Sequence, residues 1–423
     1  MGGYQVQGRS VLVIGGGIIG LCSAWYALKA GWRVAVVERG APEHDSCSLG
    51  NAGMIVPSHF VPLAAPGMVA MGIKMLPNPE SPFAVALRPR KDLIDWGLKF
   101  WRASTPDHVR RAAPLLRDLN LLSRAGYSEL AGEIGDFGLT QAGLLMLCKT
   151  EAALHEEAEL AKRANALGVP AEVLSAEETA KLDPQVRMDV AGAVYFPQDS
   201  HLAPRTLIAR LTEALQKNGV TFHWNTEVTG WETEPGRNIT GLKTTAGTQT
   251  ADEYVLAGGA WTTELSKTLG LYLPMQAGKG YSMTLEAPRE LPRLCSILTE
   301  ARVAVTPMQG SLRFGGTMEL GGLDESVNPA RVRGIIRLIP RYFPAYSEED
   351  FAGKPVWSGL RPCSPDGLPY VGRSKRWHNL TIATGHAMMG LSLGPVTGML
   401  VSDILCDAYP RLPLDLLEPE RFR

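Results

Sequence analysis

Three glycines early in the chain have the spacing of a phosphate-binding turn. In the stretch VLVIGGGIIG, Gly15 allows a tight turn, Gly17 a close approach by a diphosphate, and Gly20 close packing of a helix on a strand. The first turn of that helix offers free N–H groups and a partial positive charge. Glu38 follows about 20 residues later, where its carboxylate can accept bonds from both hydroxyls of a ribose. The motif predicts a dinucleotide site, and Glu38 argues against NADP because it would repel a 2′-phosphate.

The elements that must position these residues can be predicted from the sequence around them. The β-branched run 11–14 predicts a buried parallel strand, and residues 18–29 predict a helix that ends at Gly31. A second strand is expected over 33–37, just before Glu38. A strand, a helix and a strand within about 30 residues form a β-α-β unit. A purely structural glycine turn is the alternative, but here the motif has its strand, helix and acidic partner.

The motif does not choose between NAD and FAD, so further contact regions must decide. The small residues of 48–54 would let the backbone pass close to a flat ring, with a glycine-rich turn as the alternative. Residues 226–228 end a predicted strand that could lie beside the nucleotide. The segment 384–390 leads into a helix near Pro395. The N-terminus of that helix could stabilise the charge of a reduced ring.

The rest of the chain predicts further helices and strands around a proline-rich segment. Residues 51–90 hold too many prolines for regular structure to dominate, which is typical of a lid or a binding loop. Helices are expected over 151–167, from a capping box at Ser175, over 204–218 and over 395–407. Strands are expected over 220–224, 255–257 and 380–384, with antiparallel alternation over 301–319.

Composition excludes several classes of protein. Lys and Arg number 42 against 43 Asp and Glu, so the net charge of −1 does not suit a strongly basic nucleic-acid binder. The 6 cysteines form no C-x-x-C pair, and the 8 histidines show no metal-ligand spacing, so no metal is expected. With a polar start and no long apolar run, we expect a cytoplasmic protein without a membrane span.

One local charge cluster could still contact a membrane. Residues 88–117 hold an excess of Lys and Arg interleaved with Trp96, Phe100 and Trp101. Basic charge beside aromatic rings can bind an anionic membrane surface. The alternative is an amphipathic helix whose aromatic residues lie in the core.

With these segments in view, the chain resembles the FAD-dependent D-amino-acid oxidase-like superfamily. Within it, the chain looks most like bacterial D-amino-acid dehydrogenases of the small-subunit type, and more distantly like glycine oxidase. The stretches that carry the resemblance are VLVIGGGIIG, VVERG, SLGNAGMIVP, AAPG, VLAGGAWT, AGKGYSMT, ARVAVTPMQGSLRFGGTMEL, GLRPCSPDGLPYVGRS and TGHAMMGLSLGPVTGMLVSDIL. They span nearly the whole chain, and only their combination is specific.

The resemblance implies FAD as a noncovalent cofactor. The residues that match its contacts are Gly15, Gly17, Ile18, Ile19 and Gly20 at the diphosphate, Glu38 and Arg39 at the ribose, and Val228 at the adenine; Cys47, Ser48, Asn51, Ala52, Gly53, Met54, Gly259, Gly385, His386, Met388, Met389, Gly390, Leu391 and Ser392 match contacts around the flavin and its neighbourhood. Some relatives attach flavin through a cysteine near 359–366, but Gly359 rather than Cys363 takes that position.

Arg361 is the residue that the resemblance places on the substrate carboxylate. A planar guanidinium suits a carboxylate because it can form two parallel hydrogen bonds. A structural pair with Asp366 is the alternative. Tyr281 is a second candidate, with a buried core tyrosine as its alternative. Val303 and Met388 stand where glycine oxidase has a tyrosine and an arginine, which favours D-alanine, D-proline or apolar D-amino acids over glycine.

The expected reaction is oxidative deamination of a D-amino acid, with hydride transfer from Cα to flavin N5. The products are a 2-oxo acid and ammonia, and the resemblance implies that electrons pass to a quinone or another respiratory acceptor. No protein base acting on Cα is required. The alternatives are an O₂-using oxidase of glycine, sarcosine or secondary amines, and an FAD-binding subunit of a larger complex. Peripheral contact with the inner face of the cytoplasmic membrane would fit a quinone acceptor.

The expected fold is α/β, with a discontinuous Rossmann-like FAD-binding domain and an antiparallel-sheet substrate domain. The first is predicted from residues 1–57, 151–271 and 356–423, and the second from 58–150 and 272–355. The active site should lie between them.

Overall fold

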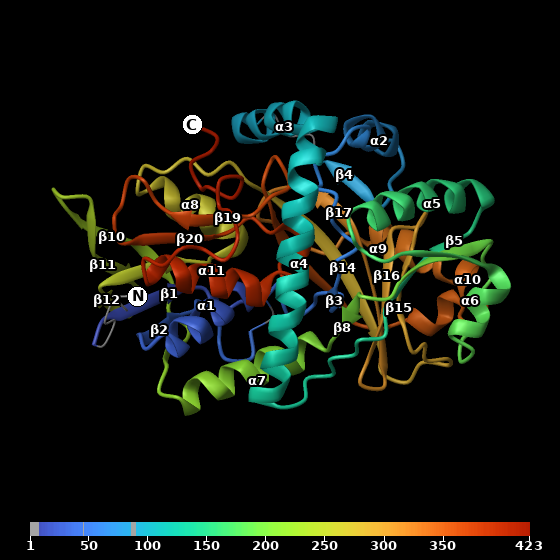
Figure 1. Cartoon of the computed structure of the whole chain (residues 1–423), viewed down its shortest axis with the longest axis horizontal. Coiled ribbons are helices and arrows are strands. Elements are labelled where there is room, and N and C mark those ends of the chain that lie inside the picture. Colours follow the sequence, from blue (N-terminus) through green and yellow to red (C-terminus); the bar gives the residue numbers. More distant parts are fainter. Residues whose placement is uncertain (1–7, 45, 86–89) are drawn as a thin grey trace.

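The computed structural model describes residues 8–44, 46–85 and 90–423, and shows two large sheets side by side (Figure 1). The first is six-stranded, in the order β19-β20-β13-β1-β2-β9. Its strands are β1 (Ser10–Ile14), β2 (Arg33–Val37), β9 (Thr221–His223), β13 (Glu253–Leu256), β19 (Tyr370–Arg373) and β20 (Leu380–Thr384). All neighbours are parallel except the edge pair β19 and β20.

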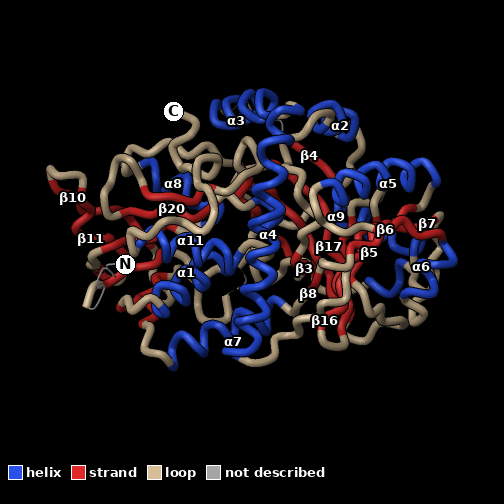
Figure 2. The backbone as a smooth tube through the Cα atoms, in the orientation of Figure 1, coloured by secondary structure: helices blue, strands red, loops and turns tan. Residues whose placement is uncertain are grey.

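The β-α-β unit has the predicted form. Helix α1 (Ile18–Lys29) connects β1 to β2, and the strand Ser10–Ile14 carries the buried apolar run. Helix α11 (Gly394–Leu405) packs along α1, while α4 (Pro106–Ile134) and α7 (Pro204–Lys217) cover the same side of the sheet. The helices α1, α4, α7 and α11 stand out together in Figure 2.

The second large sheet follows the order β18-β14-β17-β16-β15-β5-β7-β6, with β4 beside β17. Its strands are β4 (Phe83–Val85), β5 (Leu144–Cys148), β6 (Glu172–Ser175), β7 (Gly192–Phe196), β14 (Gln276–Leu285), β15 (Cys295–Leu298), β16 (Val303–Met308), β17 (Ser311–Leu320) and β18 (Val356–Cys363). Its pairs are antiparallel except β4 with β17 and β5 with β15. The predicted combination of a parallel nucleotide-type sheet and an antiparallel sheet is therefore confirmed.

Smaller elements complete the fold. The strands are β3 (Met54–Ile55) with β8 (Ser200–His201), and β10 (Val228–Glu234), β11 (Asn238–Thr244) and β12 (Gly247–Gln249). The helices are α2 (Met68–Met75), α3 (Lys91–Ala103), α5 (Glu151–Ala166), α6 (Ala176–Leu182), α8 (Thr262–Lys267), α9 (Pro329–Ile336) and α10 (Ile339–Tyr342). Thr150 caps α5 through the Ala153 N–H, and Ser175 forms the expected capping box with Glu178.

Two short parts of the predicted FAD-binding domain pair with the second sheet. Residues 151–271 were expected with the nucleotide-binding part, but β6 and β7 pair beside β5 in the second sheet. Likewise β18, expected with the first part, pairs with β14. These strands pair with partners that are distant in sequence. The amino-acid composition of a segment gives no sign of such pairing, so the sequence did not predict it. The exact boundaries of the two parts remain a prediction.

The charge cluster of 88–117 divides between α3 and α4, apart from Arg88, which lies outside the described residues. Trp96 is buried and stacks on Phe100, whereas Trp101 is exposed. Arg90 pairs with Asp92, and Lys99 with Asp95. Trp96 therefore lies in the core, as expected for an amphipathic helix. Within this cluster, contact with a membrane could involve only the exposed face of α3.

Candidate active site

A cavity of about 600 Å³ lies where the glycine turn and the carboxyl end of β2 meet the segment after β20. Gly15 has φ +112°, and a Cβ there would come 2.5 Å from the Ala257 carbonyl oxygen. A Cβ on Gly20 would come 1.8 Å from the Gly15 carbonyl oxygen. Both glycines are required by close approach of the backbone, and Gly15 also by its left-handed conformation. This is the turn that the motif predicted.

Glu38 is fixed at one end of this cavity. Its two carboxylate oxygens accept hydrogen bonds from the Gly16 N–H at 2.7 Å and the Gly40 N–H at 2.8 Å. Beside it, the Arg39 guanidinium lies 3.6 Å from the ring centre of Trp261. Arg39 and Trp261 both line the cavity. Sequence reasoning missed Trp261, although the quoted stretch VLAGGAWT contains it.

The loop before β3 is tied to the start of α1. Ser48 Oγ accepts a hydrogen bond from the Ile18 N–H at 3.0 Å, so the loop reaches the helix N-terminus. From β17, the buried Arg313 donates to the carbonyl oxygens of Leu49 and Asn51 at 3.0 and 2.8 Å. Asn51 Oδ1 in turn accepts from the Gly53 N–H. The loop is thus held to α1 and to the second sheet.

The segment after β20 forms another wall of the cavity. His386 is buried, and its Nε2 lies 2.9 Å from Thr397 Oγ1, which leaves the buried Nδ1 without a hydrogen-bond partner within the described structure. Burial lowers the pKa of His386 to about 3. The cavity wall therefore carries a neutral imidazole.

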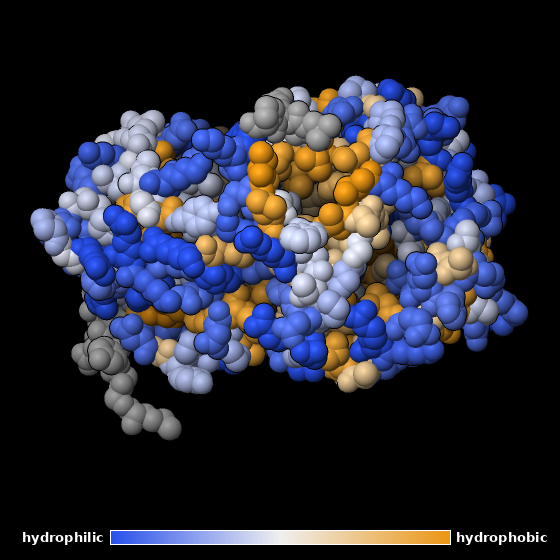
Figure 3. All heavy atoms as spheres, turned by 90° about the horizontal axis from the view of Figure 1, so that it is seen from above, coloured by the Kyte–Doolittle hydropathy of each residue, from blue (hydrophilic) through white to orange (hydrophobic). Residues whose placement is uncertain are grey.

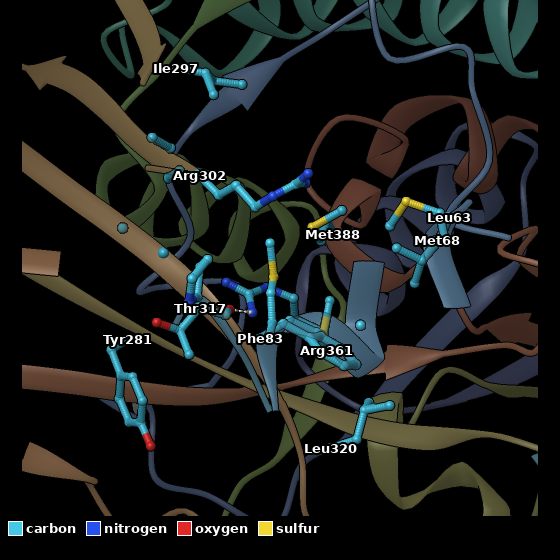
Figure 4. A pocket seen from close by; sticks show the side chains of 18 of the residues that line it. Leu63, Met68, Phe83, Tyr281, Ile297, Arg302, Thr317, Leu320, Arg361 and Met388 are labelled. Carbon is cyan, nitrogen blue, oxygen red and sulfur yellow. Dashed lines mark hydrogen bonds between the residues drawn. The ribbon is translucent and has the colours of Figure 1, made fainter. Parts of the chain in front are cut away.

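A second, mainly apolar cavity of about 660 Å³ adjoins the first (Figure 4). Cys47, Asn51 and Arg361 line both cavities, so the two meet at these residues. The second is enclosed by residues from α2, β4, α3, β17 and β18, including Met68, Met71, Met75, Phe83, Trp96, Phe100, Met318 and Trp357. Figure 3 shows the hollow on the face near α2 and α3, surrounded by hydrophobic residues.

Arg361 extends from β18 at the junction of the cavities. Its Nη1 donates to the Thr317 carbonyl oxygen at 2.7 Å (Figure 4). Asp366, the alternative partner, instead holds Arg421 through two bonds of 2.7 and 2.8 Å. Within the part of the chain that the structure describes, no carboxylate forms an ion pair with Arg361. Most of this guanidinium is therefore available to an anion in the cavity.

Comparison with known proteins agrees with this geometry. The model of the family "FAD dependent oxidoreductase" matches residues 10–404. The chain belongs to this family. It is 29% identical to a D-amino acid dehydrogenase of Helicobacter pylori over 410 residues, which is 97% of this chain and 98% of the relative. The protein is thus an FAD-dependent oxidoreductase, and its cofactor is FAD.

Solved structures agree with the fold. Glycine oxidase from Geobacillus kaustophilus matches with a TM-score of 0.78 and 25% identity, covering 98% of this chain and 99% of the other. Glycine oxidase from Bacillus cereus matches with a TM-score of 0.76 and 23% identity, covering 98% and 99%.

In this FAD-dependent oxidoreductase, most of the residues predicted for the site gather around the two cavities. Those that line the first are Gly15, Gly17, Ile18, Ile19, Glu38, Arg39, Cys47, Ser48, Asn51, Val228, Gly259, Arg361, His386, Gly390 and Leu391. Those that line the second are Cys47, Asn51, Ala52, Met54, Tyr281, Arg361, Met388 and Met389. The remaining four, Gly20, Gly53, Gly385 and Ser392, line neither cavity and have packing contacts instead.

The Tyr281 hydroxyl is not positioned as expected for a group that binds the substrate. Its side chain is 1% exposed, and its hydroxyl bonds to Glu319 Oε2 at 3.1 Å and to the Asn328 N–H at 3.2 Å. In Figure 4 this hydroxyl points away from Arg361. The surroundings fit the alternative of a core tyrosine. Val303 is also in the core, and its neighbour Ala304 lines the cavity in its place.

Three charged or titratable residues that line the second cavity were not predicted from the sequence. Arg302 enters it from the turn before β16 (Figure 4), Glu157 from α5 and His59 from the loop after β3. Burial raises the pKa of Glu157 and lowers that of Arg302. Arg302 stands inside a stretch that was recognised, but nothing in its spacing signals a site. Only the folded chain brings these three together.

Residues 8–44, 46–85 and 90–423 contain no group of three His, Cys, Asp or Glu arranged to hold a metal ion. No helix in those ranges has the length and apolar character needed to cross a bilayer.

Proposed function

We propose that this flavoenzyme oxidatively deaminates D-amino acids to 2-oxo acids and ammonia. The observation that carries the proposal is the Arg361 guanidinium, which lacks a carboxylate partner among the described residues and stands where the substrate-type cavity meets the cofactor cavity. Similarity to a D-amino acid dehydrogenase over 97% of the chain supports the choice of substrate. The preference for the D-stereoisomer rests on that similarity.

FAD, when bound, would supply the redox chemistry as the acceptor of the substrate hydride. Arg361 binds the carboxylate and thereby orients the substrate α-carbon toward the junction of the cavities. The apolar side chains of α2, α3 and β17 exclude water and accommodate the substrate side chain. With Met388 and Ala304 at the cavity wall, we expect D-alanine, D-proline and apolar D-amino acids to be preferred over glycine.

The residues of the first cavity are proposed to bind FAD noncovalently. The N-terminus of α1 with Gly15, Gly17, Ile18 and Ile19 would hold the diphosphate, because its first-turn N–H groups lack helical partners. Glu38 would hold the ribose, while the stacked pair of Arg39 and Trp261 would flank the adenine end. His386, which lines the same cavity, would lie at the flavin end.

For the electron acceptor we propose a quinone dissolved in a membrane, reached from the cytoplasmic side. Helices α2 and α3 line the apolar cavity and expose apolar side chains outward: Ile73 at 63%, Ile94 at 58%, Leu98 at 52% and Trp101 at 62%. Exposed cations, namely Lys74, Lys91 and Arg102, flank them. Apolar side chains beside cations fit the interface of an anionic bilayer.

The deciding experiment follows the flavin absorption of the purified protein under anaerobic conditions. D-Alanine and D-proline should bleach the oxidised flavin, whereas L-alanine and sarcosine should not. Bleaching by sarcosine or glycine alone would instead favour the alternative of an oxidase of glycine, sarcosine or secondary amines, in line with the similarity to glycine oxidase. Readmitted air should reoxidise the flavin slowly and a soluble quinone rapidly. A flavoprotein that no amine bleaches would instead favour the subunit of a larger complex.

Variants of Arg361 test the assignment directly. Arg361→Ala should lower kcat/KM for D-alanine by about 100-fold or more, because a charge-assisted bidentate pair is worth roughly 3 kcal/mol. Arg361→Lys keeps the charge without the planar fork and should recover only part of the loss. Arg289→Ala is the matched control, because Arg289 is exposed and pairs with Asp350 away from both cavities. Near-normal turnover of Arg361→Ala would refute the assignment.

A further inference from the structure

The proposed reaction leaves a buried carboxylate unexplained. Asp199, in the turn between β7 and β8, is 0% exposed. Its Oδ2 accepts a hydrogen bond from the Ser58 hydroxyl at 2.5 Å, and its Oδ1 accepts from the Ser58 N–H at 3.0 Å. No cation among the described residues forms an ion pair with it. A carboxylate without a paired charge is costly to bury. The burial of Asp199 therefore suggests that this residue has a function.

Ser58 connects this carboxylate to the substrate-type cavity. The Ser58 hydroxyl lies 3.0 Å from Nδ1 of His59, and His59 lines the cavity that Arg361 enters. The far ring nitrogen, Nε2, has no hydrogen-bond partner among the described residues. A continuous chain of hydrogen bonds therefore runs from the cavity through an imidazole and a hydroxyl to a carboxylate that has no contact with solvent.

The proposed reaction needs a proton acceptor in this cavity. An amino acid arrives with its amine protonated, and only the neutral amine has the lone pair that drives hydride loss from Cα. We propose that His59, Ser58 and Asp199 form a proton relay that takes this proton from the substrate ammonium group. The inference rests on the proposed function and deepens it, since it concerns the amine of the same substrate.

The relay moves one proton along each bond and changes no other atom. The N–H bond of the ammonium breaks as His59 Nε2 gains its proton. His59 Nδ1 then gives its proton to Ser58 Oγ, and the Ser58 hydroxyl proton passes to Asp199 Oδ2. The ionised carboxylate becomes a carboxylic acid, the imidazole changes tautomer, and the amine is left neutral. The proton returns by the same path after the product has left.

The environment of each group suits its part. Burial lowers the pKa of His59 to about 4, so the imidazole is neutral and passes a proton on rather than keeping it. Burial raises the pKa of Asp199 to about 7, closer to that of an ammonium group than the pKa of an ordinary carboxyl is, which makes this carboxylate a better acceptor for the relayed proton. The titratable or charged groups around Asp199 are Arg124 of α4 and Cys295 of β15, with His201 beside it in the chain. The charge of Arg124 lowers the pKa of Asp199 and so opposes the effect of burial. The raised pKa of Cys295 keeps its thiol neutral.

The test measures the rate of flavin reduction by saturating D-alanine in the holoenzyme between pH 6 and pH 10. Ser58→Ala removes the middle of the relay, and the rate at pH 7 should fall by about 100-fold, as for loss of a positioned acid–base group. The rates of Ser58→Ala and wild type should converge near pH 10, where the substrate amine is already neutral. Ser58→Thr keeps a hydroxyl and should stay within a fewfold of wild type at every pH.

A structural role would give a different result. If Ser58 serves only to fix the loop, the rate of Ser58→Ala will fall by the same factor at all pH values, and the relay is refuted. His59→Ala provides the second test: added imidazole should restore its rate at pH 7 and should not affect Ser58→Ala. Convergence at high pH in Glu157→Gln but not in Ser58→Ala would assign the proton to Glu157 and also refute the relay. Failure of the wild type itself to react with D-amino acids would refute the proposed function instead.

Discussion

At the scale of single residues, the site depends on which charges already have partners. Asp366 is held by Arg421, so Arg361 keeps its guanidinium for an incoming anion. Glu38 accepts from two backbone N–H groups and remains beside the cofactor cavity. Pairings of this kind cannot be read from spacing, because Asp366 is close to Arg361 in sequence while Arg421 is not.

The burial of His201 predicts how the free energy of unfolding depends on pH in mild acid. His201 is 4% exposed, and burial lowers its pKa to about 4 from 6.5. As the pH falls from 6.5 toward 4, the unfolded chain binds a proton at this residue that the folded protein does not. The free energy of unfolding therefore decreases over this range, by up to about 1.4 kcal/mol per pH unit.

His201→Gln should remove this contribution. Urea unfolding of the holoenzyme at pH 7, 6 and 5 should show a smaller loss of stability in the variant than in the wild type. The exposed His378 supplies the control, because His378→Gln should leave the pH dependence unchanged. Equal pH dependence in wild type and His201→Gln would contradict the prediction.

At the scale of elements, the close contact of α1 with α11 holds the cofactor turn in place. Gly398 of α11 faces the backbone of α1, where a Cβ would come 2.5 Å from the Cys22 carbonyl oxygen. Gly394 is similarly close to Ile18 and Tyr127. Because α1 presents its N-terminus to the cavity proposed to bind FAD, any displacement of this helix is expected to reach the proposed diphosphate site.

Gly398→Ala should therefore destabilise the protein by about 2 kcal/mol or more, as overpacking does in a tight core, and weaken FAD retention. Gly132→Ala in α4 is the matched control, because a Cβ there meets nothing within 4 Å. That change should raise stability by up to about 1 kcal/mol through helix propensity. Thermal unfolding and the FAD content after gel filtration measure both, and equal effects of the two variants would refute the packing argument.

The sequence predicted many of the helices and strands, but it did not show with which strands some of them pair. The ranges 18–29, 33–37 and 380–384 agree with α1, β2 and β20, because their apolar patterns and flanking glycines are local signals. The long helix α4, which contains Pro114, was not predicted as a unit, and neither was the place of β6 and β7 in the second sheet. Strand neighbours that are distant in sequence leave no local signal.

At the scale of the whole molecule, the two sheets place one cavity beside the other, and the apolar one forms a hollow surrounded by hydrophobic residues (Figure 3). Helices α2 and α3, which line it, also expose apolar side chains. If these faces of α2 and α3 contact a bilayer, the holoenzyme should sediment with vesicles that contain anionic lipid. Binding should weaken with added salt, because cations such as Lys91 and Arg102 contribute through electrostatic attraction.

The paired change Ile94→Glu and Leu98→Glu should reduce vesicle binding by about tenfold or more, because two apolar side chains no longer enter the interface. Val173→Glu is the control, since Val173 is 49% exposed on β6 but belongs to neither helix. Flavin reduction by D-alanine in solution should survive in all three proteins. Equal vesicle binding by the paired variant and the control would contradict membrane contact through α2 and α3.

The sequence alone determined the dinucleotide turn, the strand and helix around it, the FAD family and Arg361 as a carboxylate-binding candidate. These rest on short-range signals: glycines at fixed spacing, an acidic residue at a strand end, and apolar runs. Only the tertiary structure decided that Arg361 lacks an acidic partner among the described residues, that the Tyr281 hydroxyl points away from it, and that His59 reaches Asp199 through Ser58. Burial and pairing arise between residues distant in the chain, and the sequence does not show which of them will meet.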